Sequence, residues 1–286
     1  MSAPDVEDCA LFHRPRYQAG IPAVIEAPDA GLGELLETAA HFYPDRVAID
    51  FLGATTTYRE LLEASERAAR LLHDAGVRRG DRVALIMPNC PQHVVAVYGA
   101  LRLGAIVAEH NPLAPAEELR AQLERHGGRV VVAWEKGVDL ILDPRSREAG
   151  AAGPEADSVD PLGGRTVFSV DLSAALPARL RAALRLPVAR AREARESMRA
   201  PRLPAGVRSW DREAARARPI PASWPRPGGR DVAVLLHTGG TTGAPKAAML
   251  THTNLRANAN QAIAWVPMLH EGGENFLSLL PFFHAF

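Results

Sequence analysis

Apolar and polar positions along residues 31–135 alternate between a helical period and short continuous apolar runs. Helical spacing of leucine and alanine predicts helices at 33–43, 57–77, 91–105 and 115–127. The helix at 57–77 opens on Thr57 with Glu60 three residues later, the pattern of a capping box, and closes near Gly76. Between the helices, short apolar runs predict strands at 47–51, 81–88, 106–110 and 129–134.

Strands that alternate with helices of this length predict parallel pairing through right-handed crossovers. The expected fold is α/β, with doubly wound, mainly parallel sheets and flanking helices. Such sheets bind ligands beyond the carboxyl ends of their strands. Asn89 and Asn111 each follow a predicted strand and stand shortly before a proline. Turn formation is the favoured interpretation of both asparagines, and ligand contact is the alternative.

Regular patterning falls away between residues 137 and 164, where EAGAAGPEADSVDPLGG has the composition of a surface loop. After a predicted strand at 166–170, residues 174–218 contain twelve arginines against four acidic residues. Leucines at helical spacing accompany the first of these arginines, until Pro187 interrupts the pattern. A solvated helical insertion is the simpler interpretation. A basic amphipathic helix on an anionic membrane surface is the alternative.

Composition narrows the class of protein. The 286 residues carry zero formal net charge and 47% hydrophobic residues, so no overall basic field favours nucleic acid. The amino-terminal residues lack the order of a signal peptide, and no apolar run reaches the roughly 18 residues of a membrane span, so a cytoplasmic location is expected. Cys9 and Cys90 are too few for a disulfide framework or a metal site, and both are expected to be free thiols.

A loop of unusual composition follows a predicted strand at 231–237. Thr238 to Lys246 contain three glycines, three threonines, a proline and a lysine. The chain has only two lysines, so the lysine here favours a need for a compact, flexible ammonium. A helix is predicted at 251–266, capped near Thr251. A strand, a glycine-rich loop and a helix bring backbone N–H groups and hydroxyls toward phosphate oxygens, so a phosphate-binding loop is predicted.

Two common phosphate-binding patterns do not fit this loop. Counted from Gly240, the second glycine of the Walker A pattern falls on Pro245 and its Ser/Thr on Ala247. No G-x-G-x-x-G dinucleotide pattern is present either. The loop is a phosphate loop of another kind.

The loop resembles T-[SG]-G-T-T-G-x-P-K followed by L-T-H-x-N, the pattern of the acyl-adenylate-forming AMP-dependent synthetases and ligases. Thr238 to Lys246 match every defined position, and residues 250–254 continue the pattern. PFFHAF at the end resembles the next family motif, P-x-x-H, through His284. Ala247 departs from the glycine that the family usually has.

The resemblance covers roughly residues 31–286. Gly239 and the basic segment are most similar to bacterial long-chain fatty acyl-CoA synthetases. The resemblance implies a two-step reaction. A fatty carboxylate attacks the α-phosphate of MgATP to give acyl-AMP and pyrophosphate, and the thiol of coenzyme A then displaces AMP. Implied ATP-binding residues are Thr238, Gly239, Gly240, Thr241, Thr242, Gly243 and Lys246. Lys246 is the implied catalytic residue, because its charge would stabilise the leaving pyrophosphate.

Three histidines need separate interpretations. The resemblance implies that His284 shapes the acyl pocket, and a packed core histidine is the alternative. His237, in a predicted strand, and His252, in the first turn of a predicted helix, are interpreted as structural.

The expected organisation is a tail at 1–30 and an incomplete AMP-binding N-terminal domain at 31–286, with an arginine-rich insertion at about 137–230. The Mg²⁺-binding acid, the ribose-binding aspartate and a C-terminal lysine are expected beyond Phe286, so residues 1–286 alone are expected to be inactive.

The implied cofactors are ATP and Mg²⁺, with coenzyme A as a substrate. The expected partners are a fatty acid or another carboxylate and no nucleic acid. Peripheral membrane contact through 174–218 stays the alternative to a solvated insertion. A ligase for an aryl or amino acid, or a noncatalytic nucleotide-binding module, remains an alternative.

Overall fold

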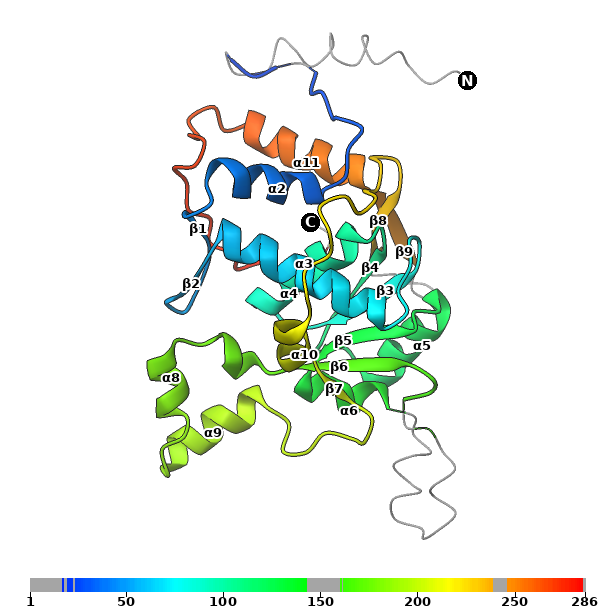
Figure 1. The fold of residues 1–286 in the computed structure, drawn as a ribbon, viewed down its shortest axis with the longest axis vertical. Coiled ribbons are helices and arrows are strands. Elements are labelled where there is room, and N and C mark those ends of the chain that lie inside the picture. The colour runs from blue at the N-terminus through cyan, green and yellow to red at the C-terminus, as the bar shows by residue number, and fades with distance from the viewer. Residues whose placement is uncertain are drawn as a thin grey trace.

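A computed structural model describes residues 17, 20–22, 24–142, 160, 162–238 and 246–284. The main sheet is built from β3 (Arg82–Ile86), β4 (Ile106–His110), β5 (Val130–Trp134), β6 (Thr166–Val170), β7 (Arg208–Ser209), β8 (Val232–His237) and β9 (Ala247–Thr251). Within these residues the strand order is β7-β6-β5-β3-β4-β8-β9 (Figure 1). All neighbours pair in parallel except β8 and β9, so the predicted α/β fold with a mainly parallel sheet is confirmed.

The helices surround this sheet, and a separate antiparallel hairpin stands beside it. The helices are α2 (Gly33–Phe42), α3 (Tyr58–Asp74), α4 (Pro91–Arg102), α5 (Ala116–His126), α6 (Glu135–Ile141), η3 (Leu172–Ala175), α8 (Ala178–Ala183), α9 (Ala189–Met198), α10 (Trp210–Arg216) and α11 (His252–Ala264). The hairpin is β1 (Val47–Phe51) with β2 (Ala54–Thr57). The predicted capping box of α3 is present: the Glu60 amide donates to Thr57 Oγ1 at 3.3 Å, and the Thr57 amide donates to Glu60 Oε2 at 2.8 Å.

The core lies on both faces of the sheet. Val83 and Leu85 of β3 pack into one apolar cluster with residues of α3 and α4, whereas Ala84 and Ile86 pack into a second cluster with Leu119 and other residues of α5 and α6. Successive side chains of a strand point to opposite faces, so a strand covered on both faces needs a continuous apolar run. This explains why apolar and polar residues do not alternate along the predicted strands.

The segment after the glycine-threonine loop differs from the prediction. β9 precedes α11 and pairs antiparallel with β8, with His237 opposite Ala247. AAMLT has four apolar residues before the cap residue of the helix, and a run this short does not distinguish a strand from the start of a helix. The predicted cap at Thr251 is present, since the Asn254 amide donates to Thr251 Oγ1 at 3.1 Å. The loop therefore joins two strands of a hairpin and does not open a helix.

Part of the range 137–230 belongs to the sheet. β6 pairs with β5, and β7 pairs with β6. Between them, α8 and α9 project from the edge of the molecule (Figure 1). The division into a tail, a domain and an insertion stays a prediction. Among the described helices, none has both the length and the apolar character needed to cross a membrane.

Candidate functional site

Three neighbouring strands of the main sheet end at its carboxyl edge, close to the predicted loop. β3, β4 and β8 are adjacent and parallel, so their carboxyl ends lie side by side (Figure 1). Asn89 follows β3, His110 ends β4, and Thr238 follows β8. This is the edge at which α/β sheets bind ligands.

The glycine-threonine loop is closed at its neck by two hydrogen bonds. The Thr238 amide donates to the Lys246 carbonyl at 2.8 Å, and the Thr238 hydroxyl donates to the same carbonyl at 3.1 Å. Both residues are exposed. Within the described ranges the Lys246 ammonium forms no ion pair, so its charge is available to an anionic ligand held by the loop.

The other predicted phosphate contacts are Gly239, Gly240, Thr241, Thr242 and Gly243, which lie outside the described residues. Their role stays a prediction. One reason given for it changes, because β9 and not a helix follows the loop. Phosphate contacts must then come from the loop backbone, the threonine hydroxyls and Lys246, without the dipole of a helix that begins at the loop.

A chain of hydrogen-bonded polar groups, with His110 and Gln122 buried, lies beside β8. The Gly128 amide donates to Nδ1 of His126 at 3.0 Å, so the proton of a neutral His126 ring is on Nε2. That Nε2–H donates to Nε2 of His110 at 3.0 Å, and His110 in turn donates from Nδ1 to the Gln122 carbonyl oxygen at 2.8 Å. Gln122 then donates to Glu118 at 2.9 Å. These bonds assign one neutral tautomer to each ring.

Burial keeps these histidines neutral. Burial lowers the pKa of His110 to about 3 and that of His126 to about 4. The His237 ring lies tilted against the His110 ring, with centroids 4.8 Å apart. Burial, together with the nearby Arg125, also lowers the pKa of His237. The three rings therefore contribute no positive charge beside the loop at neutral pH. His237 thus packs against the core, as interpreted from the sequence.

His252 is also structural in its contacts. It is fully buried at the first position of α11, and its Nδ1 accepts a hydrogen bond from the Leu32 amide at 3.0 Å. This bond joins the start of α11 to the start of α2.

His284 lies at the end of a segment that Asn89 holds. The His284 amide donates to the Pro281 carbonyl at 3.1 Å, which forms a turn. The Asn89 amide group donates to the Ser278 carbonyl at 3.1 Å and to the Leu280 carbonyl at 2.8 Å, and its oxygen accepts from the Phe282 amide at 2.9 Å. The favoured interpretation of Asn89 as a turn residue therefore missed its long-range contacts.

A buried histidine–carboxyl pair stands next to this segment. His93 Nε2 lies 2.9 and 3.0 Å from the two carboxylate oxygens of Glu109, and both residues are almost completely buried. The Phe282 ring packs edge-on against His93, with centroids 5.5 Å apart. Glu109 and His110 end an otherwise apolar strand, and two ionisable residues in a buried run indicate buried partners. That feature of the sequence could have singled out Glu109 and His110, but not the partners of either residue.

The buried thiol at this edge is not a nucleophile. Burial raises the pKa of Cys90 to about 12, so the thiol stays protonated at neutral pH. Cys9 lies outside the described residues.

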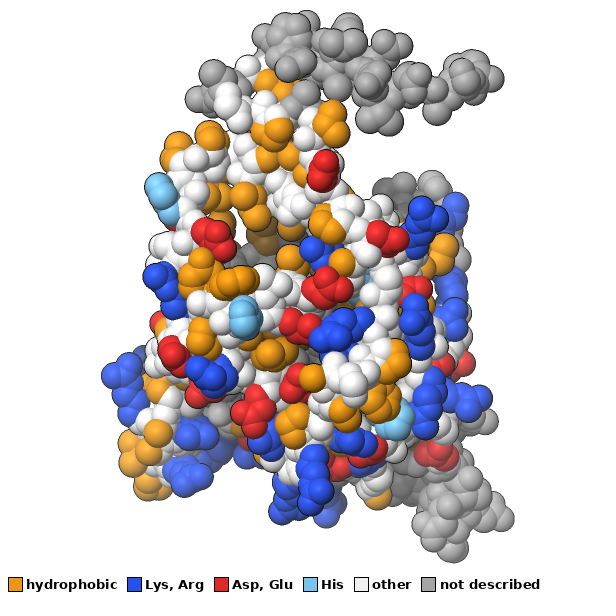
Figure 2. Space-filling view, turned by 45° about the horizontal axis from the view of Figure 1, so that its top comes forward, with side chains coloured by type: hydrophobic (Ala, Val, Ile, Leu, Met, Phe, Trp, Pro, Cys, Tyr) orange, Lys and Arg blue, Asp and Glu red, His pale blue; other side chains and the backbone are white. Residues whose placement is uncertain are grey.

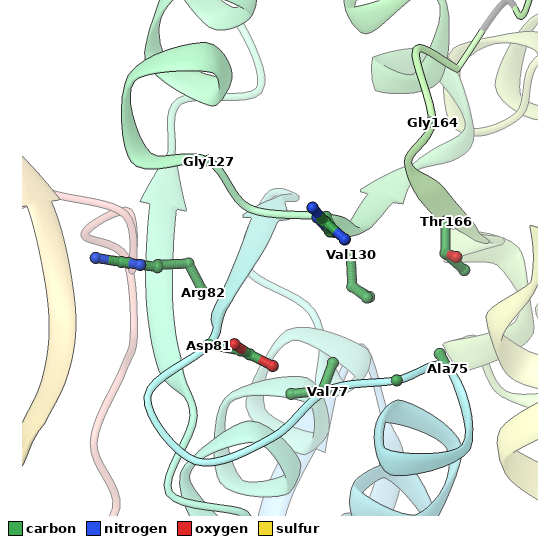
Figure 3. A pocket seen from close by; sticks show the side chains of 10 residues that line it. Ala75, Val77, Asp81, Arg82, Gly127, Val130, Gly164 and Thr166 are labelled. Carbon is green, nitrogen blue, oxygen red and sulfur yellow. The ribbon is translucent and has the colours of Figure 1, made fainter.

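Two cavities of useful size flank the sheet. An apolar cavity of about 740 Å³ lies at the carboxyl edge between α2, the β1–β2 hairpin, α4 and the segment 276–282, with Asn89 in its wall. A polar cavity of about 490 Å³ lies at the opposite edge, near the amino ends of β3, β5 and β6, and is lined by Asp81, Arg82 and Thr166 (Figure 3). No predicted site residue lines the second cavity, and within the described ranges no cluster of three or more His, Cys, Asp or Glu side chains could hold a metal ion.

The mainly parallel sheet with helices on both faces defines a doubly wound α/β protein. The AMP-binding enzyme family matches residues 36–286, so the chain belongs to that family. A long-chain-fatty-acid–CoA ligase of Bacillus subtilis is 31% identical over 270 residues, which cover 94% of this chain and 45% of the relative. The ligase of the same name from Salmonella typhimurium is 34% identical over 278 residues, covering 95% of this chain and 46% of the relative.

A solved structure supports the fold. The anthranilate CoA ligase AuaEII in complex with anthranoyl-AMP has a TM-score of 0.58 and 18% identity, over 79% of this chain and 35% of that chain. The chain spans less than half the length of the curated relatives that it matches.

Proposed function

We propose that the chain supplies the N-terminal portion of a long-chain fatty acid–CoA ligase, an acid–thiol ligase that uses ATP. In the first step a fatty carboxylate oxygen attacks the α-phosphorus of ATP, and pyrophosphate leaves to give acyl-AMP. In the second step the thiol of coenzyme A attacks the acyl carbon and AMP leaves. The observation that carries the proposal is the loop between Thr238 and Lys246, closed at its neck at the carboxyl edge of the sheet.

Lys246 has the central role in this proposal. Negative charge accumulates on the pyrophosphate as it leaves, and an ammonium positioned there stabilises the transition state more than the ground state. The loop residues 238–243 would hold the β- and γ-phosphates through N–H groups and hydroxyls. Mg²⁺, when bound with ATP, would screen the phosphate charge. His284 would border the acyl site, next to the apolar cavity of about 740 Å³.

A contact with a membrane surface is a second part of the proposal. From residue 172 to 192 the chain has arginines at 179, 181, 185, 190 and 192 and no acidic residue. Leu180, Leu186 and Val188 are 39%, 54% and 50% exposed among them. Figure 2 shows basic and apolar side chains side by side at the lower left, over α8 and α9. Positive charge with exposed apolar side chains fits an anionic lipid surface. ATP and coenzyme A are cytoplasmic metabolites, so we place the reaction at the cytoplasmic face.

Amine labelling of the native protein that contains these residues tests the proposal. Lys136 and Lys246 are the two lysines of the chain, and Lys136 lies over the Trp134 ring, 5.6 Å from its centroid, in another part of the fold. Saturating MgATP should slow acylation of Lys246, followed by mass spectrometry, and leave Lys136 unchanged. Equal labelling of Lys246 with and without MgATP would contradict the proposed phosphate contact.

A further inference from the structure

We propose that Asn89 and the buried His93–Glu109 pair are positioning residues that set the place of the substrate carboxylate through the segment 278–284. The proposal rests on the proposed function, in which His284 borders the acyl site. Neither Asn89 nor the pair needs to touch the substrate. They act by fixing the backbone that carries His284.

Asn89 uses its whole side-chain amide on this segment. Its NH₂ group donates to the Ser278 and Leu280 carbonyls, and its oxygen accepts from the Phe282 amide, with distances between 2.8 and 3.1 Å. All three bonds reach residues about 190 positions later in the chain. A single side chain thus replaces the pairing that a neighbouring strand would give to an extended segment.

Little apolar surface is buried at two positions of this segment. Leu279 and Leu280 are 76% and 60% exposed, so burial of their side chains contributes little to its position. The hydrogen bonds from Asn89 therefore contribute more to the position of this backbone than hydrogen bonds contribute in a packed core. Asn89 itself follows β3 closely and is carried by the sheet.

The His93–Glu109 pair provides a second contact from the same sheet. Glu109 is on β4, and its two oxygens face His93 Nε2 at 2.9 and 3.0 Å, which fixes the orientation of the ring. The Phe282 ring meets His93 at an interplanar angle of 77°, an edge-to-face arrangement that depends on ring orientation. Phe282 is therefore held by its amide on Asn89 and by its ring on His93, two residues before His284.

Asn111 shows that this arrangement is more than turn formation. Both asparagines follow a strand and precede a proline, but the Asn111 side chain accepts from the Leu113 amide at 2.9 Å, which is a local turn contact. Asn89 instead reaches across the carboxyl edge. Because Asn89 and residues Phe276 to Ser278 also line the apolar cavity of about 740 Å³, movement of the segment changes the shape of that cavity.

Hydrogen exchange tests the contact itself. In the native protein that contains these residues, Asn89→Ala should speed amide exchange of Phe282 by about two- to tenfold, the factor expected for one lost hydrogen bond of ordinary strength. Asn111→Ala is the matched control and should leave exchange in 278–284 unchanged. Equal protection of Phe282 in native and Asn89→Ala protein would overturn the proposal.

Kinetics test the positioning role. In acid-dependent ATP–pyrophosphate exchange, Asn89→Ala should raise the KM for palmitate by about tenfold and leave the KM for ATP within about twofold. Asn89→Asp has the same shape but presents a carboxylate to two carbonyl oxygens, so it should not restore the palmitate KM. Native kinetics in Asn89→Asp would mean that only the size of the side chain matters and would overturn the proposal.

The pair is tested separately with Glu109→Gln, which keeps the shape and removes the charge opposite His93. The palmitate KM should rise and the ATP KM should not, while equal changes in both would indicate general loss of structure and contradict a positioning role. Failure of the native protein to use any carboxylate would contradict the proposed function, and the positioning role with it. Normal native activity with an unchanged palmitate KM in all three variants would contradict the positioning role alone.

Discussion

Thr238 and Lys246 are joined across the neck of the glycine-threonine loop, since both the amide and the hydroxyl of Thr238 donate to the Lys246 carbonyl. The backbone of Lys246 is therefore anchored to the end of β8 while its ammonium stays exposed. An anchored backbone with an exposed ammonium suits the phosphate contact that we propose for Lys246.

Removing the Lys246 ammonium should slow ATP use strongly. In the native protein that contains this chain, we expect Lys246→Ala to reduce the rate of acyl-adenylate formation by about one to three orders of magnitude, the range for loss of one charged transition-state contact. Single-turnover formation of AMP measures it. Lys136→Ala is the matched control, because it removes the other lysine from an exposed position beside Trp134 and should keep the native rate. An unchanged rate in Lys246→Ala would remove this lysine from the mechanism.

The contact between α3 and α4 should not tolerate a methyl group at Gly99. A Cβ there would lie 2.8 Å from the Ala68 Cβ and 3.1 Å from the Ser65 carbonyl. We expect Gly99→Ala to lower the free energy of unfolding, because an overpacking cost of about 1–3 kcal/mol exceeds a helix-propensity gain of about 1 kcal/mol. Urea unfolding measures the difference.

Gly33 provides the control for this substitution. It begins α2, and a Cβ there would meet no atom within 4 Å. Gly33→Ala should leave the protein equally or more stable. A Gly99→Ala protein as stable as the native one would show that α3 and α4 can separate without cost.

Stability should decrease as the pH falls through the acidic range. Burial lowers the pKa of His110 to about 3 in the folded chain, whereas an unfolded histidine titrates near 6.5. Between these values the unfolded chain binds a proton that the folded chain does not, so the free energy of unfolding falls with pH, by at most about 1.4 kcal/mol per pH unit for this group. Above about pH 6.5 both states are neutral at His110, and its contribution no longer changes with pH.

The variant His110→Gln should make this slope shallower between about pH 4.5 and 6.5, because it removes one buried proton-binding group. His270→Gln is the control, since the His270 side chain is 85% exposed and its replacement should leave the slope unchanged. Urea unfolding across this pH range gives both slopes. Identical slopes in native and His110→Gln protein would contradict a neutral, buried His110.

The α8–α9 projection should bind anionic vesicles. The native protein should sediment with vesicles that contain phosphatidylserine, and salt should reverse the binding, because screening weakens attraction between arginines and lipid headgroups. Arg181→Gln with Arg185→Gln should weaken binding. Arg59→Gln with Arg230→Gln removes the same charge elsewhere and should not. Absence of sedimentation at low salt would end the membrane interpretation.

The periodic part of the chain was predictable because local sequence determines it. Leucine spacing and the Thr57–Glu60 pair placed α3 correctly, and continuous apolar runs placed β3, β4 and β5. β9 was missed because AAMLT is short, and only its pairing with β8 makes it a strand. α6 was missed because its seven residues include a glycine and two charged residues beyond its first position.

The loop could be found from composition, but the residues around it could not. Glycine, threonine and lysine in one run indicate phosphate whatever the rest of the fold is. Unlike the loop, the role of Asn89 could not be predicted from local sequence. Its hydrogen-bond partners lie about 190 residues later in the chain, and the residues next to Asn89 do not indicate them. The same holds for His93 with Glu109, which only the packing of α4 on β4 brings together.

Acid-dependent ATP–pyrophosphate exchange by the native protein that contains residues 1–286 tests the central claim most directly. Palmitate, benzoate and a mixture of amino acids would be compared at equal concentration with MgATP, and coenzyme A would then be added to detect the thioester. The account predicts exchange that depends on palmitate, and palmitoyl-CoA once the thiol is present. Exchange with benzoate or amino acids alone would assign another carboxylate, and no exchange with any acid despite ATP binding would contradict a ligase.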